Sequence, residues 1–273
     1  MRARFDQGEG MTSKWCAAVF LVFVLAVGGA PAGEIRRISL DGSPRSAGPE
    51  EEIGKDGLAR IKKLSEPILE LYPAPAQPGR GTVVVMPGGG YGALAVEHEG
   101  REVAKWLNEA GWDAVILLYR VGAGPETREW ALADAKAGLQ LVRSRGAEFQ
   151  LSPKKIGVIG FSAGGHLSAR LAHESGAGAL HFVGLVYPAY LEENGKCRDD
   201  VSPVSGPVFL YVAEDDKHAP ASFAYAAACV ANGIRCDFHH PALGGHGFGF
   251  KPGRPESVRD WPEKFRQFLA ELK

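Results

Sequence analysis

Residues 156–165 read IGVIGFSAGG, and this stretch decides the fold. Residues 156–161 form a short apolar run, which is typical of a strand buried on both faces of a parallel sheet. Residues 163–173 follow as a predicted helix. Ser162 therefore lies in a Gly-x-Ser-x-Gly turn between a strand and a helix. In that setting a sharp, strained turn exposes the hydroxyl of a nucleophilic serine at the end of a sheet.

Two other interpretations of this turn are an ordinary Gly-rich turn and a phosphate-binding loop. A Walker-type phosphate loop is excluded because no Gly-Lys-Ser/Thr sequence follows. The pentapeptide alone is a weak signal, since the chain contains 36 glycines. The order of strand, turn and helix around it strengthens the prediction. The helix N-terminus would also direct free N–H groups towards the reacting centre.

Short apolar runs and helical patterns alternate on both sides of this stretch. Strands are predicted at residues 68–72, 82–86, 114–119, 156–161, 182–186, 208–213 and 236–239, and helices at 100–110, 130–145, 163–173, 221–232 and 261–272. This alternation predicts an α/β fold with a mostly parallel central sheet and helices on both faces. Ligands bind outside the carboxyl ends of the strands in such sheets. The chemistry is therefore expected in the loops at 87–98, 161–164, 214–220 and 241–249.

Residues 1–32 are predicted to be a secretory signal peptide. Lys14 precedes an apolar run at 15–27, and a stretch of mostly small residues follows at 28–33. The run is about 13 residues long, whereas a helix that spans a bilayer needs roughly 20. An uncleaved membrane anchor is the alternative interpretation. Export predicts a secreted or periplasmic protein with no stable membrane insertion after cleavage.

Two further segments follow the predicted signal peptide. Residues 33–64 are polar and rich in Gly and Pro, and only residues 57–64 indicate a short helix. We expect this segment to be an N-terminal extension on the surface. Residues 65–273 carry the regular pattern and are predicted to form the catalytic domain.

The composition excludes some classes of partner. The 273-residue chain has 45% apolar and 23% charged residues, which is ordinary for a globular protein. Its 31 basic and 32 acidic residues nearly balance. Nucleic acids and acidic surfaces are bound by a concentrated basic region, which this balance does not indicate. No nucleic-acid partner is therefore expected.

Three cysteines lie beyond the predicted signal peptide: Cys197, Cys229 and Cys236. In an oxidising compartment one pair could form and leave an odd thiol. The sequence does not decide which pair. No cysteine lies in a Gly-rich turn beside a candidate base, so a catalytic cysteine is not expected.

A second glycine-rich turn, Pro87-Gly88-Gly89-Gly90-Tyr91, follows the predicted strand at 82–86. Glycines at this place free backbone N–H groups to face an oxyanion, and each such donor is worth about 3 kcal/mol in the transition state. The predicted donors are the N–H groups of Gly89 and Gly90, together with that of Ala163 after the nucleophile. An ordinary tight turn is the alternative.

The acid and the base of a catalytic triad are expected after later strands, in the chain order Ser, Asp/Glu, His. Residues 213–220 read AEDDKHAP, in which Asp216, Asp215 and Glu214 compete for the acid position. A helix N-cap is the other role for an aspartate there. His246 lies in the sequence GGHGFG at 244–249, beyond the last predicted strand, where the general base belongs.

The other histidines fit the position of the base less well. His239 and His240 end a predicted strand, where a packed or solvent-facing role is expected. His166 lies four residues after Ser162 on the predicted helix, so its side chain would point away from the turn and serve the structure.

Taken with these motifs, the sequence resembles the secreted acetyl xylan esterase-like α/β-hydrolases of the carbohydrate-esterase type. The resemblance covers residues 65–273 and rests on the stretches 86–92, 98–100, 103–108, 119–120, 157–166 and 244–250. It implies an α/β-hydrolase fold and removal of acetyl groups from xylan or related polysaccharides, without a metal or other cofactor. The spacing of Asp216 before Ala219-Pro220 is similar to the D-x-x-V-P pattern of such hydrolases, which favours Asp216 as the acid.

The resemblance also suggests where substrate binds. His98 and Glu99 recur in these relatives and are expected to shape the entrance near the acyl pocket, with Tyr91 as a further substrate-binding residue. An acid near a helix start is the alternative explanation for Glu99. Residues 192–201 are short and polar, so any lid over the site is expected to be small.

The expected enzyme is a serine carboxylic ester hydrolase. Ser162 attacks the ester, His246 acts as base and then as acid, and Asp216 orients His246. The expected partner is an acetylated carbohydrate or another small ester. The alternatives are a small-ester or lactone hydrolase and a serine exopeptidase or amidase of the same fold. A binding protein with an inactive site is disfavoured because all three triad positions are filled.

Overall fold

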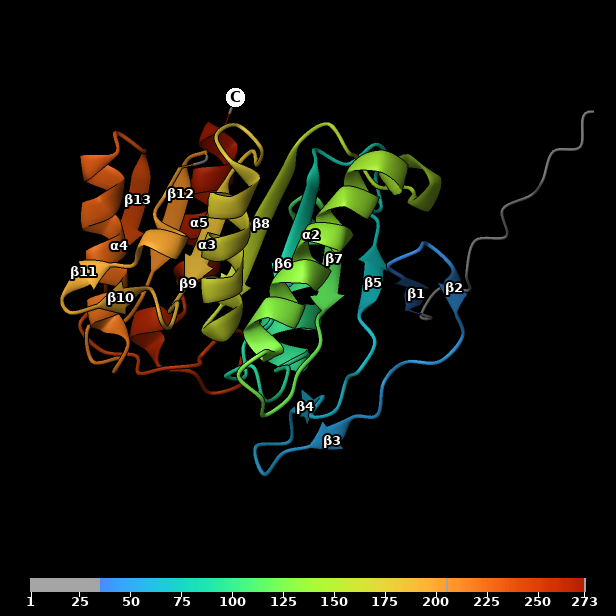
Figure 1. The fold of residues 1–273 in the computed structure, drawn as a ribbon, viewed down its shortest axis with the longest axis horizontal. Helices are drawn as coiled ribbons and strands as arrows, with labels where there is room; N and C mark the ends of the chain where they lie inside the picture. Colours follow the sequence, from blue (N-terminus) through green and yellow to red (C-terminus); the bar gives the residue numbers. More distant parts are fainter. Residues whose placement is uncertain (1–34, 205, 273) are drawn as a thin grey trace, which may run out of the picture. The chain divides into compact units, whose positions relative to one another are not determined.

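A nine-stranded sheet forms the centre of the structure, a computed structural model that describes residues 35–204 and 206–272. Figure 1 shows the strands, whose order is β13-β12-β9-β8-β6-β7-β5-β1-β2. The six strands from β13 to β7 run parallel, and β5, β1 and β2 add antiparallel pairs at one edge. Their bounds are β1 Arg36–Ser39, β2 Pro44–Arg45, β5 Ile68–Tyr72, β6 Thr82–Met86, β7 Asp113–Leu118, β8 Ile156–Phe161, β9 Val183–Val186, β12 Val208–Tyr211 and β13 Cys236–His239.

Helices cover both faces of this sheet, as the sequence predicts. The helices are α1 Glu102–Glu109, α2 Thr127–Arg145, α3 Ala163–Ser175, α4 Ala219–Ala231 and α5 Trp261–Glu271. Figure 1 shows α2 and α3 in front of the central strands and α5 behind them. Aromatic contacts join α1 to α5, where the ring centroids of Trp106 and Phe265 lie 6.0 Å apart.

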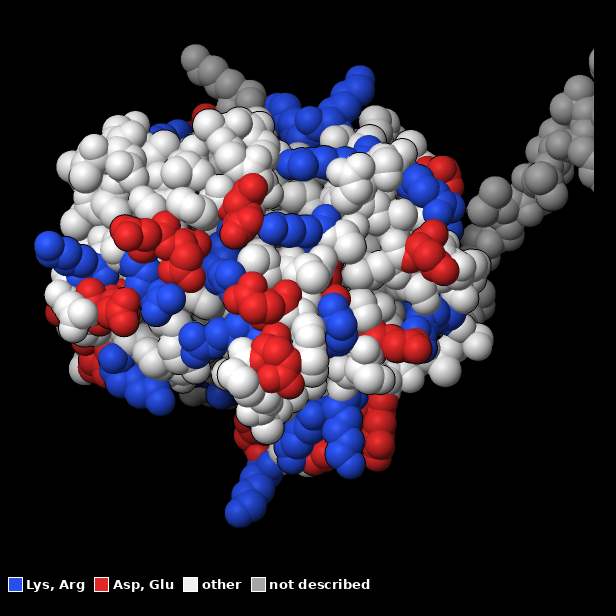
Figure 2. Space-filling view, viewed as in Figure 1, with Lys and Arg blue, Asp and Glu red and all other residues white. Residues whose placement is uncertain are grey.

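Shorter elements decorate the loops. They are β3 Glu52–Ile53, β4 Ala59–Arg60, β10 Glu192–Glu193, β11 Lys196–Cys197, the π-helical turn η1 Glu97–Arg101, and the 3₁₀ turns η2 Gly146–Phe149, η3 Asp199–Val201 and η4 Glu256–Val258. No helix among the described residues is long and apolar enough to cross a membrane. The predicted signal peptide, residues 1–32, lies outside the described part of the chain. On the face seen in Figure 2, basic and acidic side chains are interspersed.

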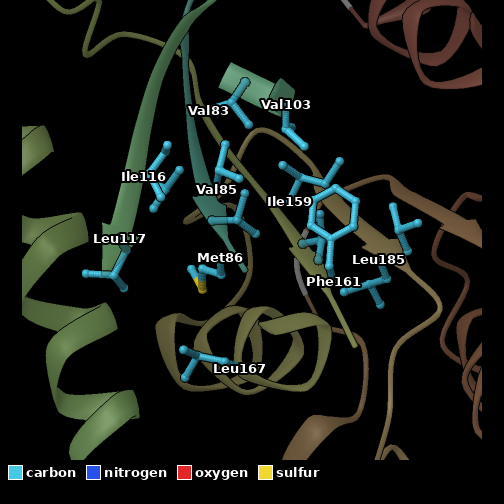
Figure 3. Close-up of a cluster of buried hydrophobic side chains, with 14 of the residues drawn as sticks. Val83, Val85, Met86, Val103, Ile116, Leu117, Ile159, Phe161, Leu167 and Leu185 are labelled. Atoms are coloured by element: carbon cyan, nitrogen blue, oxygen red, sulfur yellow. The ribbon is translucent and has the colours of Figure 1, made fainter. Parts of the chain in front are cut away.

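The core explains why the central strands read as continuous apolar runs. Every residue of β6, β7 and β8 is buried, because helices cover both faces of the sheet. Figure 3 shows Val83 close to Val103 of α1 on one side, and Met86 close to Leu167 of α3 on the other. Full burial of one such side chain contributes roughly 1.5–3 kcal/mol. The sheet therefore provides a rigid platform for the loops at its carboxyl edge.

Most predicted elements of the sheet are confirmed. The predicted strands at 68–72, 82–86, 156–161 and 236–239 have the observed bounds. The predicted helix at 100–110 begins as a π-helical turn and ends at Glu109, and Gly111 beyond it has a φ of +80°, which suits a glycine after a helix.

The N-terminal segment differs from the prediction. Residues 57–64 form no helix; instead β4 pairs with β3, and Ile61 bridges to Leu94. Part of the segment also leaves the surface and joins the sheet, since β1 pairs with β5 and Ile38 is 1% exposed. An uncovered β5 would leave a row of unpaired backbone groups at the edge of the sheet, and β1 satisfies them. Residues from Ile35 onward belong to one compact unit, so the predicted boundary at residue 65 does not mark a break in it.

Candidate active site

Ser162 lies at a sharp turn between β8 and α3. Its φ of +51° and ψ of −117° fall outside the regions that a residue with a side chain ordinarily adopts. Such strain costs about 1–3 kcal/mol and persists only where the surroundings enforce it. Here the Ser162 N–H donates to Val186 O at 3.1 Å, and the Ala189 N–H donates to Ser162 O at 3.1 Å. The sheet thus holds the serine hydroxyl at its carboxyl edge.

The two glycines of the motif allow the helix to start this close to the sheet. A Cβ atom on Gly160 would lie 2.1 Å from Gly164 O, and one on Gly164 would lie 2.0 Å from Met86 O. Both distances are far below van der Waals contact with backbone atoms, which cannot move aside. Any larger residue at either position would push α3 away from β6 and β8.

A chain of hydrogen bonds leads from the serine to a buried carboxylate. Ser162 Oγ lies 2.8 Å from His246 Nε2, and His246 Nδ1 lies 2.7 Å from Asp216 Oδ2. The side chain of Asp216 is fully buried, and its other oxygen accepts a hydrogen bond from the His218 N–H at 2.8 Å. A buried carboxylate in this position orients the imidazole and stabilises its protonated form.

The structure separates Asp216 from its two acidic neighbours. Asp215 accepts a hydrogen bond from the Gly245 N–H at 2.8 Å, and so contacts the backbone of the loop that carries His246. Glu214 faces His240 Nδ1 at 2.8 Å on the surface. Of the three competing acids, the structure places only Asp216 against the imidazole of His246.

The second glycine-rich turn lies against the serine. A Cβ atom on Gly88 would lie 2.8 Å from Ser162 Cβ, so only a glycine fits between the turn and the nucleophile. Gly89 and Gly90 follow with φ of +131° and +66°. No described residue accepts a hydrogen bond from the N–H of Gly89 or Gly90. Ala163 is the first residue of α3, so its N–H has no carbonyl partner within the helix.

These groups surround a pocket of about 290 Å³. Its lining residues are Arg60, Gly89, Gly90, Ala95, His98, Glu99, Ser162, Tyr190, Lys217, His218, His246, Gly247 and Lys251. The arrangement can bring a small acyl group to a serine nucleophile, a base and free N–H donors at one place.

Comparisons with known proteins agree with this geometry. The family model BD-FAE matches residues 69–193. An acetylxylan esterase from Xylanibacter ruminicola is 28% identical over 206 residues, which cover 64% of this chain and 42% of that protein. The acetyl ester-xyloside bifunctional hydrolase from Caldicellulosiruptor lactoaceticus superposes with a TM-score of 0.64 at 27% identity, covering 75% of this chain and 88% of the other. The chain has the α/β-hydrolase fold and is similar to acetylxylan esterases.

Two further relatives extend the comparison. MGS-M1, an α/β-hydrolase enzyme from a deep-sea metagenome library, has a TM-score of 0.62 at 22% identity and covers 82% of this chain and 96% of its own. The endo-1,4-beta-xylanase B from Butyrivibrio fibrisolvens is 30% identical over 95 residues, 34% of this chain and 15% of that protein. This α/β-hydrolase thus spans less than half the length of the curated relatives it matches.

His98 and Glu99 lie deep in the wall of the pocket of this α/β-hydrolase, and both are buried. Glu99 Oε2 accepts a hydrogen bond from the Gly88 N–H at 2.7 Å, and its Oε1 accepts one from the Tyr187 hydroxyl at 2.9 Å. Burial raises the pKa of Glu99. Burial likewise lowers the pKa of His98 to about 4, so this imidazole is neutral near pH 7. Glu99 therefore supports the glycine-rich turn from behind.

Tyr91 does not line the pocket around Ser162. It is 3% exposed, and its hydroxyl lies 2.7 Å from His166 Nδ1. Its exposed edge faces a neighbouring hollow instead. Burial lowers the pKa of His166 to about 3, and its side chain is buried against Tyr91, in line with the predicted structural role. The tyrosine that lines the pocket is Tyr190.

Several residues that line the pocket were not predicted from the sequence. His218 lies in the acid-bearing loop, and its ring centroid is 5.0 Å from that of His246. Its position two residues after Asp216 in the chain was the available signal. Arg60 and Tyr190 come from distant segments, and no motif marks them.

Metal and thiol chemistry have no assembled centre in the part of the chain that the structure describes. No group of three or more His, Cys, Asp or Glu side chains there is arranged to hold a metal ion. Cys197, Cys229 and Cys236 are free thiols, and Cys229 and Cys236 are hydrogen-bonded to each other. The predicted formation of one disulfide therefore stays a prediction.

Proposed function

We propose that this α/β-hydrolase is a serine carboxylic ester hydrolase that removes acetyl groups from acetylated polysaccharide such as xylan. The observation that carries the proposal is the hydrogen-bonded chain from Ser162 through His246 to Asp216 at a pocket of acyl size. The relatives support the substrate class, because they include an acetylxylan esterase and an acetyl ester-xyloside hydrolase.

The first half of the reaction transfers the acetyl group to the enzyme. Ser162 Oγ attacks the carbonyl carbon while His246 Nε2 takes the hydroxyl proton. Asp216 stabilises the imidazolium that forms, because its carboxylate is buried against Nδ1. The bond between the carbonyl carbon and the sugar oxygen then breaks, and His246 gives its proton to the sugar hydroxyl. Acetyl-Ser162 is left.

The second half releases acetate. A water molecule gives a proton to His246 and attacks the acetyl carbon, and Ser162 leaves with the proton that His246 returns. In both halves the negative charge on the carbonyl oxygen is stabilised by the N–H groups of Gly89, Gly90 and Ala163. Each such donor is worth about 3 kcal/mol in the transition state. These steps use only groups of the chain itself.

A hydrolase of small esters or lactones is the second candidate. A pocket of about 290 Å³ that opens to the surface admits such compounds without a polymer. An exopeptidase has less support, because a free peptide amine needs an acidic partner. Glu99 is the one carboxylate among the described residues that line the pocket, and both of its oxygens are already hydrogen-bonded.

We also propose that the protein is exported, to the periplasm or out of the cell. Lys14 and the apolar run at residues 15–27 support this location. They lie outside the described residues, so the proposal depends on the sequence alone. Mass spectrometry of the protein recovered after expression tests it, because cleavage after residue 32 removes the whole predicted segment.

Release of acetate from acetylated xylan is the experiment that tests the activity. The wild-type chain is expected to release acetate, and Ser162→Ala is expected to release none above the uncatalysed background. p-Nitrophenyl acetate serves as a small ester that needs no sugar contact. Turnover of p-nitrophenyl acetate but not of xylan would move the assignment to the second candidate. Full activity of Ser162→Ala on either compound would refute the mechanism.

A further inference from the structure

The pocket around Ser162 is the first of three consecutive hollows. Gly90 lines both this pocket and a second hollow of about 710 Å³, which also contains Tyr91 and Arg128. Gly122 lines both the second hollow and a third of about 490 Å³. The shared glycines show that the three hollows follow one another. We call them together the catalytic groove.

The lining of the catalytic groove is strongly basic. Its charged cationic residues are Arg60, Lys62, Lys63, Arg120, Arg128, Lys217 and Lys251. Among the described residues that line it, the one carboxylate is Glu99, which is buried and hydrogen-bonded through both oxygens. The chain as a whole has a net charge of −1, and the face seen in Figure 2 mixes both signs. Positive charge is therefore concentrated where the substrate would lie.

Three of these cations are already paired. Lys62 contacts Glu52, Arg60 contacts Asp56, and Arg120 contacts Asp134. The other four, which are Lys63, Arg128, Lys217 and Lys251, form no ion pair with a described carboxylate. A cation without a partner in a hollow can bind an anionic group of a ligand at little cost, because no existing ion pair has to break.

Two of the unpaired cations lie at the reacting end. Lys217 directly follows the triad acid Asp216 and lines the pocket. Lys251 Nζ lies 3.8 Å from the position that a Cβ atom on Gly247 would take, next to His246. Glu99 and His246 face the same pocket, but Glu99 lies beneath its surface. An anion near the ester would therefore meet two ammonium groups.

An exposed aromatic ring lies at the far end of the catalytic groove. Trp130 is 41% exposed and lines the third hollow, where the guanidinium of Arg120 lies 5.8 Å from its ring centroid. A large ring that remains in water offers a flat apolar face, and the ring of a sugar has one too. The groove thus combines a surface for stacking with cations along its length.

We propose that the catalytic groove binds an extended acetylated sugar chain that carries carboxylates, such as those of uronic acid residues. The unpaired lysines recognise the carboxylates, and Trp130 stacks on a sugar ring away from the scissile ester. This inference rests on the proposed esterase activity and makes its substrate class narrower. The proposed substrate is thus a negatively charged polymer and not a neutral one.

The first experiment compares two esters that differ only in charge. One is an acetylated xylo-oligosaccharide with a uronic acid branch, and the other carries the primary amide of that uronic acid, which is neutral and is not itself an ester. At low ionic strength we expect kcat/KM to favour the acid by about tenfold, the effect of roughly two solvated ion pairs. The ratio of the two kcat/KM values should fall towards one as added salt screens the charges. Equal kcat/KM for both esters in an enzyme that still turns over p-nitrophenyl acetate would overturn this inference alone.

Variants assign the preference to the groove. In the double variant Lys217→Gln/Lys251→Gln the ratio of the two kcat/KM values should fall to about one or two. Lys154→Gln removes the same charge from an exposed lysine outside the groove and should keep the wild-type ratio. An unchanged ratio in the double variant would refute the assignment. Loss of p-nitrophenyl acetate hydrolysis in the wild type would instead refute the proposed function.

A length series tests the far end. We expect kcat/KM of the wild type to rise with the number of sugar units. Trp130→Ala should lower this increase in kcat/KM by about fivefold or more, since stacking on an aromatic ring is worth roughly 1 kcal/mol. Phe223→Ala removes a similarly exposed ring from α4 and should keep the gain. A gain that survives in Trp130→Ala would overturn the stacking role. Inhibition by a DNA oligonucleotide as strong as by the deacetylated acidic oligosaccharide would show that the groove does not select sugars.

Discussion

Two loops meet at Ser162, and an acidic side chain is hydrogen-bonded to the backbone of each. Glu99 is buried and accepts hydrogen bonds through both oxygens, from the Gly88 N–H and the Tyr187 hydroxyl. Asp215 is exposed and accepts a single hydrogen bond, from the Gly245 N–H. Water can replace Asp215 as the hydrogen-bond acceptor, but it has no access to the groups that Glu99 contacts. The glycine-rich turn should therefore depend on its acid far more than the histidine loop does.

The histidine loop has a second, buried connection, which takes part in the chemistry of the proposed mechanism. Asp216 lies next to Asp215 in the chain, but its side chain is fully buried against His246 Nδ1. The two neighbours differ in what they hold: Asp215 contacts backbone, and Asp216 contacts the imidazole itself. Substitution of each acid in turn separates support of a loop from support of the base.

The largest effect is expected for Asp216→Asn. The amide keeps the shape but can no longer stabilise an imidazolium, and it favours the wrong tautomer of His246. We expect kcat for p-nitrophenyl acetate to fall by about 10⁴-fold. A loss of tenfold or less, with Asp215→Asn losing more, would transfer the role of the acid to Asp215.

Glu99→Ala should have the next largest effect. Without the carboxylate, the Gly88 N–H and the Tyr187 hydroxyl lose their buried partner, and the turn that carries the oxyanion donors loosens. We expect kcat to fall by about 10²-fold, as for loss of one donor, with little change in KM.

Glu99→Gln is the matched control for this positioning role. Its amide oxygen can still accept from the Gly88 N–H, and its NH₂ can donate to the Tyr187 oxygen if that hydroxyl rotates. We expect it to recover most of the activity that Glu99→Ala loses, with both variants folded by near-ultraviolet circular dichroism. Equal losses in both variants would mean that the charge, and not the two contacts, matters.

A buried histidine gives the glycine-rich side of the site a pH dependence of stability. The pKa of His166 falls from 6.5 to about 3 on folding, because burial disfavours the charged ring. The unfolded chain thus binds the proton more tightly, and the free energy of unfolding should fall as the pH drops below about 6.5. The slope for one such group is about 1.4 kcal/mol per pH unit.

Urea unfolding at pH 7, 6 and 5 measures this slope. His166→Gln keeps an acceptor for the Tyr91 hydroxyl but does not titrate, so its stability should fall less steeply with acid than that of the wild type. Other groups, including buried His98, contribute to both proteins alike. If the free energy of unfolding changed with pH by the same amount in both proteins, protonation of His166 would not destabilise the fold.

The parts of the site that could be predicted from sequence are those that local chain geometry determines. The turn at Ser162 needs a strand before it and a glycine two residues away on each side, at Gly160 and Gly164. All three features appear in ten consecutive residues. Residues 87–91 lie directly after β6, and His246 lies in the loop that follows β13, both with glycines around them. Because parallel strands end at one edge of a sheet, the order along the chain was enough to bring these segments together.

The parts that could not be predicted depend on contacts between distant segments. Tyr91 follows the glycines in the chain, yet its ring turns to His166, and Tyr190 from another loop lines the pocket. β1 joins the sheet between β5 and β2 because β5 needs a partner, although the sequence of β1 is short and mixed. Arg60 and Lys251 reach the pocket from opposite ends of the chain.

The distribution of charge over the folded molecule could not be predicted from the sequence either. A balance of 31 basic and 32 acidic residues gave no sign of a basic region, because a sum over the chain says nothing about where charges lie. Folding concentrates cations along the catalytic groove, whereas both signs are mixed on the face seen in Figure 2. The net charge therefore cannot exclude an acidic substrate.

The smallest effect is expected for Asp215→Asn, and it tests the opening comparison most directly. The amide oxygen of asparagine can still accept the Gly245 N–H, and water reaches both groups, so little is lost when the charge goes. We expect kcat/KM for p-nitrophenyl acetate to change by about twofold or less. Asp215→Ala, which removes the acceptor as well, should lose no more than about fivefold, because water replaces it. A loss of activity as large as that of Glu99→Ala would contradict this comparison. It would show that water does not replace Asp215, and that the histidine loop needs its acid as much as the glycine-rich turn needs Glu99.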